Sequence, residues 1–236
     1  LLNLLNLENY DFKEIIKKYN LNDNIINKTA RQIVHQKPEI LCINTYFYSI
    51  AIQHNHINLH NALPWSNKIN KHKNNMTSIL FPINHNNNHW LLIHVNIKNK
   101  EIQQIDSLHS ATQHDYTETF LQYIKTTLST SNETEWTTLH KLTPQQENGY
   151  DCGVHMLGNI QRIAHPSLIN NANPSRHSIL SMLLTGNPNE IFQGTTAPNQ
   201  HPRTHKHIQQ RVYKPHAKPK ITTKEQKKPA TRPHTS

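Results

Sequence analysis

The sequence predicts a domain that contains both helices and strands, because helical and strand patterns both occur over roughly the first 165 residues. The clearest strand pattern lies at residues 90–97, where every second residue is a large aliphatic one. The clearest helical pattern lies at residues 112–128, where apolar residues recur every four positions. The apolar positions are Leu91, Ile93, Val95 and Ile97 in the strand and Tyr116, Phe120, Ile124 and Leu128 in the helix. A polar turn at residues 98–100 joins the strand to a second one at 101–107, which predicts an antiparallel hairpin.

The segments before the hairpin are expected to be mainly helical. Residues 11–35 read as helix, loop and helix, with Asn22 or Asp23 as the candidate N-cap of the second helix. Residues 40–52 are apolar on nearly every side, so we expect a buried helix there, with a strand as the alternative. Residues 53–78 are polar and are interpreted as a loop. A short strand is expected at residues 79–83.

The segments after the hairpin lead to a cysteine. Residues 136–142 are a third strand candidate, and residues 143–151 are rich in turn-forming residues. A helix is then predicted from Cys152 to about Ala164, with apolar residues near one face. We therefore predict one folded domain over residues 1–190, followed by a tail over residues 191–236.

Composition separates the tail from the rest of the chain. Hydrophobic residues make up only 34% of the 236 residues, and the formal net charge is +10. Residues 197–236 hold ten of the 25 Lys and Arg residues, a single acidic residue, Glu225, and six of the 13 prolines. Such a segment buries too little apolar surface to offset the entropy of ordering, so we predict that the tail is disordered.

Cysteine usage and hydropathy limit the cellular context. Two cysteines, Cys42 and Cys152, predict free thiols in a reducing, intracellular compartment. No apolar run approaches the roughly 20 residues of a membrane span, so no membrane partner is expected. Because the chain begins at Leu1 rather than Met, we expect it to be a fragment of a longer protein.

Cys152 has the local setting of a nucleophile. It stands between a turn and a predicted helix, with Gly149 and Gly153 near it. A helix N-terminus carries unpaired N–H groups and a partial positive charge, which favour the reactive thiolate. Glycines permit unusual backbone angles and close approach of a substrate. The alternative is a buried core cysteine, which is how we interpret Cys42 in its apolar run.

Three further residues complete a candidate catalytic set. His89 stands just before the first hairpin strand and Asp106 ends the second, so strand pairing brings them close together. A histidine oriented by a carboxylate is the base that activates a cysteine nucleophile. Gln146, on the loop before Cys152, would donate to the developing oxyanion together with the backbone N–H of Cys152. Taken singly, each has an ordinary alternative: one of 19 histidines, a turn-capping aspartate or a solvated glutamine.

At these residues the sequence resembles the SUMO proteases, the ubiquitin-like-protein-specific cysteine proteases related to the adenoviral proteinase. The matching segments are 81-FPINHNNNHWLLIHVNIKNKEIQQIDSL-108 and 144-PQQENGYDCGVHM-156, with a weaker match at 21-LNDNII-26. The similarity spans roughly residues 10–165.

The resemblance implies an α+β, papain-like fold with a central mixed sheet flanked by helices and the nucleophile at a helix N-terminus. It implies that His89 is the base, Asp106 its orienting group and Cys152 the nucleophile, with Gln146 in the oxyanion hole. Trp90 would line a narrow channel that admits the Gly-Gly end of a ubiquitin-like modifier, SUMO first among them.

The implied reaction is hydrolysis of the peptide or isopeptide bond after that Gly-Gly, through an acyl-enzyme and without a cofactor. One position departs from the family pattern. Many members carry a Trp just before the Leu-Asn-Asp segment as the second channel wall, and Asn20 stands there in this chain. This departure leaves SUMO itself less firmly implied than the protease class.

Other functions remain open at this stage. The chain could be an inactive module that binds a ubiquitin-like protein, or a processing protease of the viral or mobile-element type. The basic tail offers non-specific nucleic-acid contact through phosphates, and together with the family it points to the nucleus. A metal site at His85, His89 and His94, or in the 54–60 cluster, is a weaker alternative, because no convincing further ligand accompanies these histidines.

Overall fold

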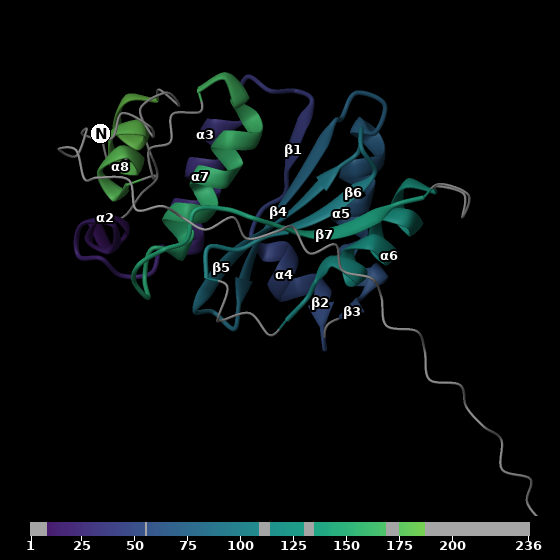
Figure 1. Cartoon of the computed structure of the whole chain (residues 1–236), viewed down its shortest axis with the longest axis horizontal. Coiled ribbons are helices and arrows are strands. Elements are labelled where there is room, and N and C mark those ends of the chain that lie inside the picture. The colour runs from purple at the N-terminus through teal and green to yellow at the C-terminus, as the bar shows by residue number, and fades with distance from the viewer. Residues whose placement is uncertain (1–8, 55, 109–113, 130–134, 169–174, 187–236) are drawn as a thin grey trace, which may run out of the picture. The chain divides into compact units, whose positions relative to one another are not determined.

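The computed structural model describes residues 9–54, 56–108, 114–129, 135–168 and 175–186. All of them lie in the first of the two units into which the chain divides, Leu1–Arg203 and Thr204–Ser236. Figure 1 shows helices on both sides of a central sheet, which confirms the α+β prediction. The predicted boundary near residue 190 and the predicted tail lie outside the described residues. No helix in the described ranges is long and apolar enough to span a bilayer.

The central sheet has five strands in the order β1-β4-β5-β6-β7. Its strands are β1 (Ile40–Cys42), β4 (Ser78–His85), β5 (His89–Asn96), β6 (Glu101–Ile105) and β7 (Thr137–Lys141). The middle strands β4, β5 and β6 pair antiparallel, whereas β1 and β7 run parallel to their neighbours. The sheet is therefore mixed, and the predicted hairpin is confirmed as β5 and β6. A separate ribbon pairs β2 (Ile52–Gln53) with β3 (His56–Ile57).

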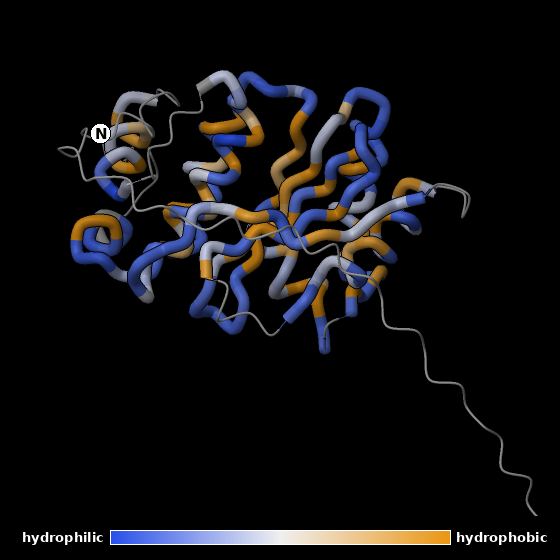
Figure 2. Tube along the Cα trace, viewed as in Figure 1, coloured by the Kyte–Doolittle hydropathy of each residue, from blue (hydrophilic) through white to orange (hydrophobic). Residues whose placement is uncertain are grey.

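Helices divide the hydrophobic core into two parts. The helices are α2 (Asn9–Ile16), α3 (Asp23–Ile33), α4 (Tyr46–Ala51), α5 (Leu59–His72), α6 (Thr117–Leu128), α7 (Cys152–Ala164) and α8 (Arg176–Thr185), with a 3-10 turn at Pro166–Leu168. One core lies between the sheet and α3, α7 and α8, and the other between the sheet and α4, α5 and α6. Figure 2 shows apolar positions along the sheet and on the helices beside it.

Strand β5 supplies side chains to both cores. Leu91, Ile93 and Val95 point to the α4–α6 side, as the alternation predicts, whereas Trp90 and Leu92 lie in the core with α7. A central strand covered by helices on both faces is buried throughout. This position fixes His89, the first residue of β5, at the end of a rigid element.

Two predictions in the first half of the chain are corrected. Residues 40–52 are not one helix: β1 pairs with β4 through backbone hydrogen bonds, and α4 begins only at Tyr46. Residues 53–78 are not a loop, because they contain the 14-residue helix α5. Asn58 caps α5 by accepting from His60 and Asn61 N–H groups, and Ala62 lies in the core. A few apolar residues are enough to anchor α5, because only one narrow stripe of the helix, with Ala62 and Ile69, is buried.

The helix predicted at residues 112–128 begins later, at Thr117. Asp115 Oδ1 accepts from the backbone N–H of Thr117, and this local turn precedes the helix. The strand at 136–142 and the helix from Cys152 to Ala164 are confirmed as β7 and α7. Helix α8 was not predicted.

Candidate active site

The predicted His–Asp pair is present at the end of the β5–β6 hairpin. His89 Nε2 lies 2.8 Å from Asp106 Oδ1, and both side chains are buried. Asp106 directly follows β6, and its Oδ1 also accepts from the backbone N–H of Leu108 at 2.9 Å. The carboxylate is thus held by its own loop and is aimed at the imidazole. The register pairs Leu92 with Ile105, so the geometry follows from the sheet.

Cys152 is brought to the same histidine from the other side. It is the first residue of α7, is only 1% exposed, and lies close enough to the His89 side chain to raise the pKa of the imidazole. Because Nε2 of His89 faces Asp106, Nδ1 is the ring nitrogen left for the sulfur. Residues far apart in the sequence therefore form one chain of contacts, Asp106 to His89 to Cys152.

Electrostatics favour a charged imidazole at His89. Burial lowers the pKa of His89, but hydrogen bonds with Asp106 and Cys152, and the negative charges of these groups, raise the pKa to about 9. His89 is therefore protonated at neutral pH, which places a positive charge beside the Cys152 sulfur. The other thiol differs, because burial raises the pKa of Cys42 to about 12. Both cysteines are free, as predicted.

Gln146 lies in the loop before α7 with its amide held at both ends. Ser107 Oγ donates to Gln146 Oε1 at 2.7 Å, and Gln146 Nε2 donates to the carbonyl of Asn148 at 2.6 Å. The backbone N–H of Gln146 also donates to the carbonyl of Ser107. An amide nitrogen has two hydrogens, so one remains for a substrate oxygen. Ser107, next to Asp106, thereby connects the hairpin to residues 143–151, the nucleophile loop that precedes Cys152.

Gly153 serves packing in this structure. A Cβ built there would lie 3.1 Å from Trp90 Cδ1 and 3.2 Å from Leu21 Cβ, which is tighter than ordinary contact. The missing side chain lets the start of α7 approach β5 and α3 closely. Gly149, by contrast, has nothing within 4 Å of its built Cβ.

Trp90 is 2% exposed and belongs mainly to the core. Its Nε1 donates to the carbonyl of Leu21 at 2.7 Å, so the indole fixes the segment that precedes α3. Asn20 lies in that segment, and its Nδ2 donates to the carbonyl of Asn88, next to His89. The predicted channel, with Trp90 as one wall and Asn20 at the other, stays a prediction.

The histidines considered as metal ligands have protein partners. His85 Nδ1 lies 2.6 Å from Tyr116 Oη, and His94 is placed between Gln103 and Ser78 at 3.0 Å from each. Among the described residues, no group of three or more His, Cys, Asp or Glu side chains could hold a metal ion. His89 is engaged with Asp106.

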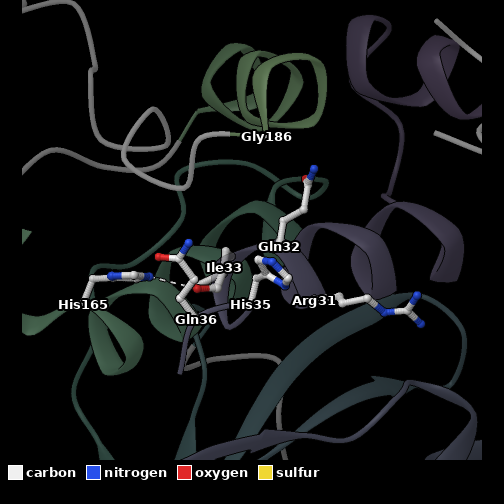
Figure 3. Close-up of a pocket in the computed structure, with 7 residues that line it drawn as sticks. All are labelled: Arg31, Gln32, Ile33, His35, Gln36, His165 and Gly186. Carbon is white, nitrogen blue, oxygen red and sulfur yellow. Dashed lines mark hydrogen bonds between the residues drawn. The ribbon is translucent and has the colours of Figure 1, made fainter. Parts of the chain in front are cut away.

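A pocket of about 380 Å³ lies at the far end of α7 from the nucleophile. Figure 3 shows that it is lined by the ends of α3 and α8 and by His165, whose Nε2 donates to the carbonyl of Ile33 at 2.9 Å. Thirteen helical residues separate it from the start of α7, a rise of about 20 Å. It contains none of the predicted site residues.

Arg176 contacts the nucleophile loop, and the sequence did not predict this contact. It lies on α8, and its guanidinium donates to the Asp151 carboxylate and to the Tyr150 carbonyl. No local motif marks this arginine, because its partners lie some 25 residues earlier in the chain. Only the packing of α8 brings them together.

A cysteine at a helix N-terminus beside an imidazole and a carboxylate, on an α+β domain with a mixed sheet, has the arrangement of papain-like cysteine proteases. The comparisons with known proteins are more specific. Residues 19–187 match the C-terminal catalytic domain of the Ulp1 protease family, and the chain belongs to this family. The family resemblance drawn from the sequence is therefore confirmed.

One curated relative is the ubiquitin-like-specific protease 1 of Saccharomyces cerevisiae, which is 28% identical over 152 residues. The alignment covers 63% of this chain and 24% of the yeast protein. The chain thus spans about a quarter of the length of this relative.

Solved structures show the same fold. The C-terminal Ulp1 protease domain in complex with Smt3, the yeast ortholog of SUMO, aligns with a TM-score of 0.62 and 23% identity, over 75% of this chain and 82% of that one. The Ulp1-like SUMO protease catalytic domain of Chaetomium thermophilum aligns at 0.59 and 22%, over 79% and 78%. The Xanthomonas campestris effector XopD bound to ubiquitin aligns at 0.54 and 17%, over 70% and 90%.

Proposed function

We propose that this chain is a cysteine protease that hydrolyses the bond after the C-terminal Gly-Gly of a ubiquitin-like modifier, with SUMO as the first candidate. The observation that carries the proposal is the contact chain from Asp106 through His89 to Cys152, with a His89 pKa of about 9. Family membership and the yeast relative support the substrate class.

In the proposed mechanism the Cys152 thiolate attacks the carbonyl carbon of the terminal glycine. The oxyanion that forms accepts from the backbone N–H of Cys152 and from the free hydrogen of Gln146 Nε2. His89 then donates its proton to the leaving amine, and a thioester remains on Cys152. A water molecule, deprotonated by His89, then attacks the thioester. This step releases the modifier as a free carboxylate and restores the Cys152 thiolate beside the protonated His89. Asp106 keeps the imidazole in place throughout.

The test uses SUMO and ubiquitin that carry either a C-terminal electrophile or a C-terminal fluorophore. The wild-type chain should form a covalent adduct and release the fluorophore, and Cys152→Ala should do neither. Cys42→Ala is the matched control and should retain both activities, because Cys42 pairs with Leu80 near one end of β4 whereas His89 pairs with His85 at the other end. Binding of the modifier without any adduct on wild type would favour the inactive binding module instead. Preference for ubiquitin over SUMO would change the substrate and leave the chemistry intact.

A further inference from the structure

Asp151, the residue before Cys152, does not cap helix α7 with its side chain, although it occupies the N-cap position. It occupies the N-cap of α7, where an aspartate usually accepts from the backbone N–H groups of the first turn. Here its side chain makes no capping hydrogen bond. Instead, Oδ1 accepts from Arg176 Nε at 2.6 Å, and Oδ2 accepts from Asn148 Nδ2 at 2.7 Å. Both carboxylate oxygens are engaged away from the helix.

Arg176 is held firmly in this contact. Its Nη2 donates to the carbonyl of Tyr150 at 2.7 Å, and its Nη1 donates to the carbonyl of Glu14 at 2.8 Å. The guanidinium also lies 5.4 Å from the centre of the Tyr150 ring. Helix α8 carries this side chain, and both α2 and the nucleophile loop bind it, so its position depends on three elements.

We propose that Arg176 is a positioning residue for Cys152, which acts by holding the Asp151 carboxylate off the N-terminus of α7 and by balancing its charge. This inference rests on the proposed function of Cys152 as the nucleophile. Two consequences follow from elementary electrostatics. A released carboxylate would accept from the N–H groups of the first turn of α7 and would place its negative charge at the helix N-terminus that favours the Cys152 thiolate. An unbalanced carboxylate would also disfavour the thiolate next to it in the chain.

Few other charged groups in the described residues bear on Cys152. His89 from β5 and Asp106 after β6 form the pair already described. His155, one turn along α7, donates from its ring to the Pro144 carbonyl and responds to the charge of Asp151. The carboxylate of Glu14 in α2 accepts from the Asn22 N–H.

Helix α3 and the segment before it contribute apolar contacts at this end of α7, through Ile26 and Leu21 beside Gly153. Asp151 is therefore the negative charge that Arg176 is placed to balance.

The experiment measures the rate at which iodoacetamide alkylates Cys152 across pH, in the full chain. Mass spectrometry of the peptides separates Cys152 from Cys42. In Arg176→Met the midpoint of the profile should rise by roughly one pH unit, which slows alkylation about tenfold at pH values below the wild-type midpoint. With a fluorogenic modifier, kcat should fall and KM should change little. Arg176→Lys keeps the charge but loses the fork of donors, so its midpoint should lie between those of the wild type and Arg176→Met.

The decisive variants change Asp151. Asp151→Asn should lower the midpoint or leave it in place, because a negative charge is lost. The double variant with Arg176→Met should return the midpoint to near the wild-type value, and a merely structural role of Arg176 would not produce this rescue.

Arg162→Met is the matched control, because Arg162 lies near the other end of α7 and donates to Asn159. It should leave the midpoint unchanged. A folded Arg176→Met chain with the wild-type profile and kcat would overturn the proposal, as would a shift that the double variant does not reverse. If Arg176→Met does not fold, a raised midpoint in Asp151→Asn overturns it. Alkylation needs no modifier, so a chain inactive on every modifier still gives a readable result.

Discussion

The Asp106 carboxylate contributes both charge and orientation to His89, and two substitutions separate these contributions. Asp106→Asn keeps an oxygen that can accept from the Leu108 N–H and from His89 Nε2, where Asp106 Oδ1 now stands. It removes only the charge. Asp106→Ala removes the charge and the hydrogen bond together. We expect the two variants to differ strongly in activity.

The magnitude follows from the pKa of His89. Its value of about 9 lies about 2.5 units above the ordinary value of 6.5, although burial lowers it. At about 1.4 kcal/mol per unit, the contacts with Asp106 and Cys152 favour the imidazolium by roughly 3.5 kcal/mol more than burial disfavours it. Asp106 provides the first of the raising contributions, so Asp106→Asn should lower the pKa of His89 by at least about one unit.

The assay is an NMR titration of the His89 ring together with kcat/KM on a fluorogenic modifier. We expect kcat/KM near neutral pH to fall roughly tenfold in Asp106→Asn and roughly a thousandfold in Asp106→Ala. Wild-type activity should decline as pH rises through about 9, and the decline should begin at lower pH in Asp106→Asn. A His89 pKa that stays near 9 in Asp106→Asn would refute the electrostatic part of this reasoning. Equal activity of the two variants would refute the separation of charge from orientation.

Three further predictions concern the oxyanion hole, packing and pH. Gln146→Ala should reduce kcat by roughly a hundredfold with little change in KM, because its amide acts on the oxyanion and not on the bound modifier; a rise confined to KM in steady-state kinetics would contradict this. Gly153→Ala should destabilise the chain by about 1–3 kcal/mol in urea unfolding, since its Cβ would press on Trp90, whereas Gly149→Ala should be nearly neutral. Burial lowers the pKa of His94 to about 4, below its unfolded value, so the unfolded chain binds a proton first and stability should fall as pH drops from about 6.5 to about 4. This acid-dependent step should be missing from the urea unfolding of His94→Leu, and an equal step in both chains would contradict the assignment.

Local patterns were sufficient for the hairpin and for the helix that begins at Cys152. The alternation at residues 90–97 reflects strand geometry directly, and the turn at 98–100 sets the register that brings Asp106 to His89. The glycine-flanked, turn-rich approach to Cys152 likewise identified a helix start. In both segments, the pattern of neighbouring residues in the sequence agrees with the secondary structure that the folded chain adopts.

Patterns failed where partners distant in sequence decide the structure. Ile40–Cys42 is a strand because β4 offers it a parallel partner, which no local periodicity reveals. Helix α5 has a polar sequence and needs only a narrow buried stripe, so its composition resembled that of a loop.

The sequence by itself determined the family to which the chain belongs and the candidate nucleophile and base, because these features depend on residues that lie near one another along the chain or on paired strands. Only the tertiary structure decided how the site is supported. Ser107 orients Gln146, and Arg176 holds Asp151 away from the helix that carries Cys152. These contacts join α8, the hairpin and the nucleophile loop, so they exist only once the two cores have packed.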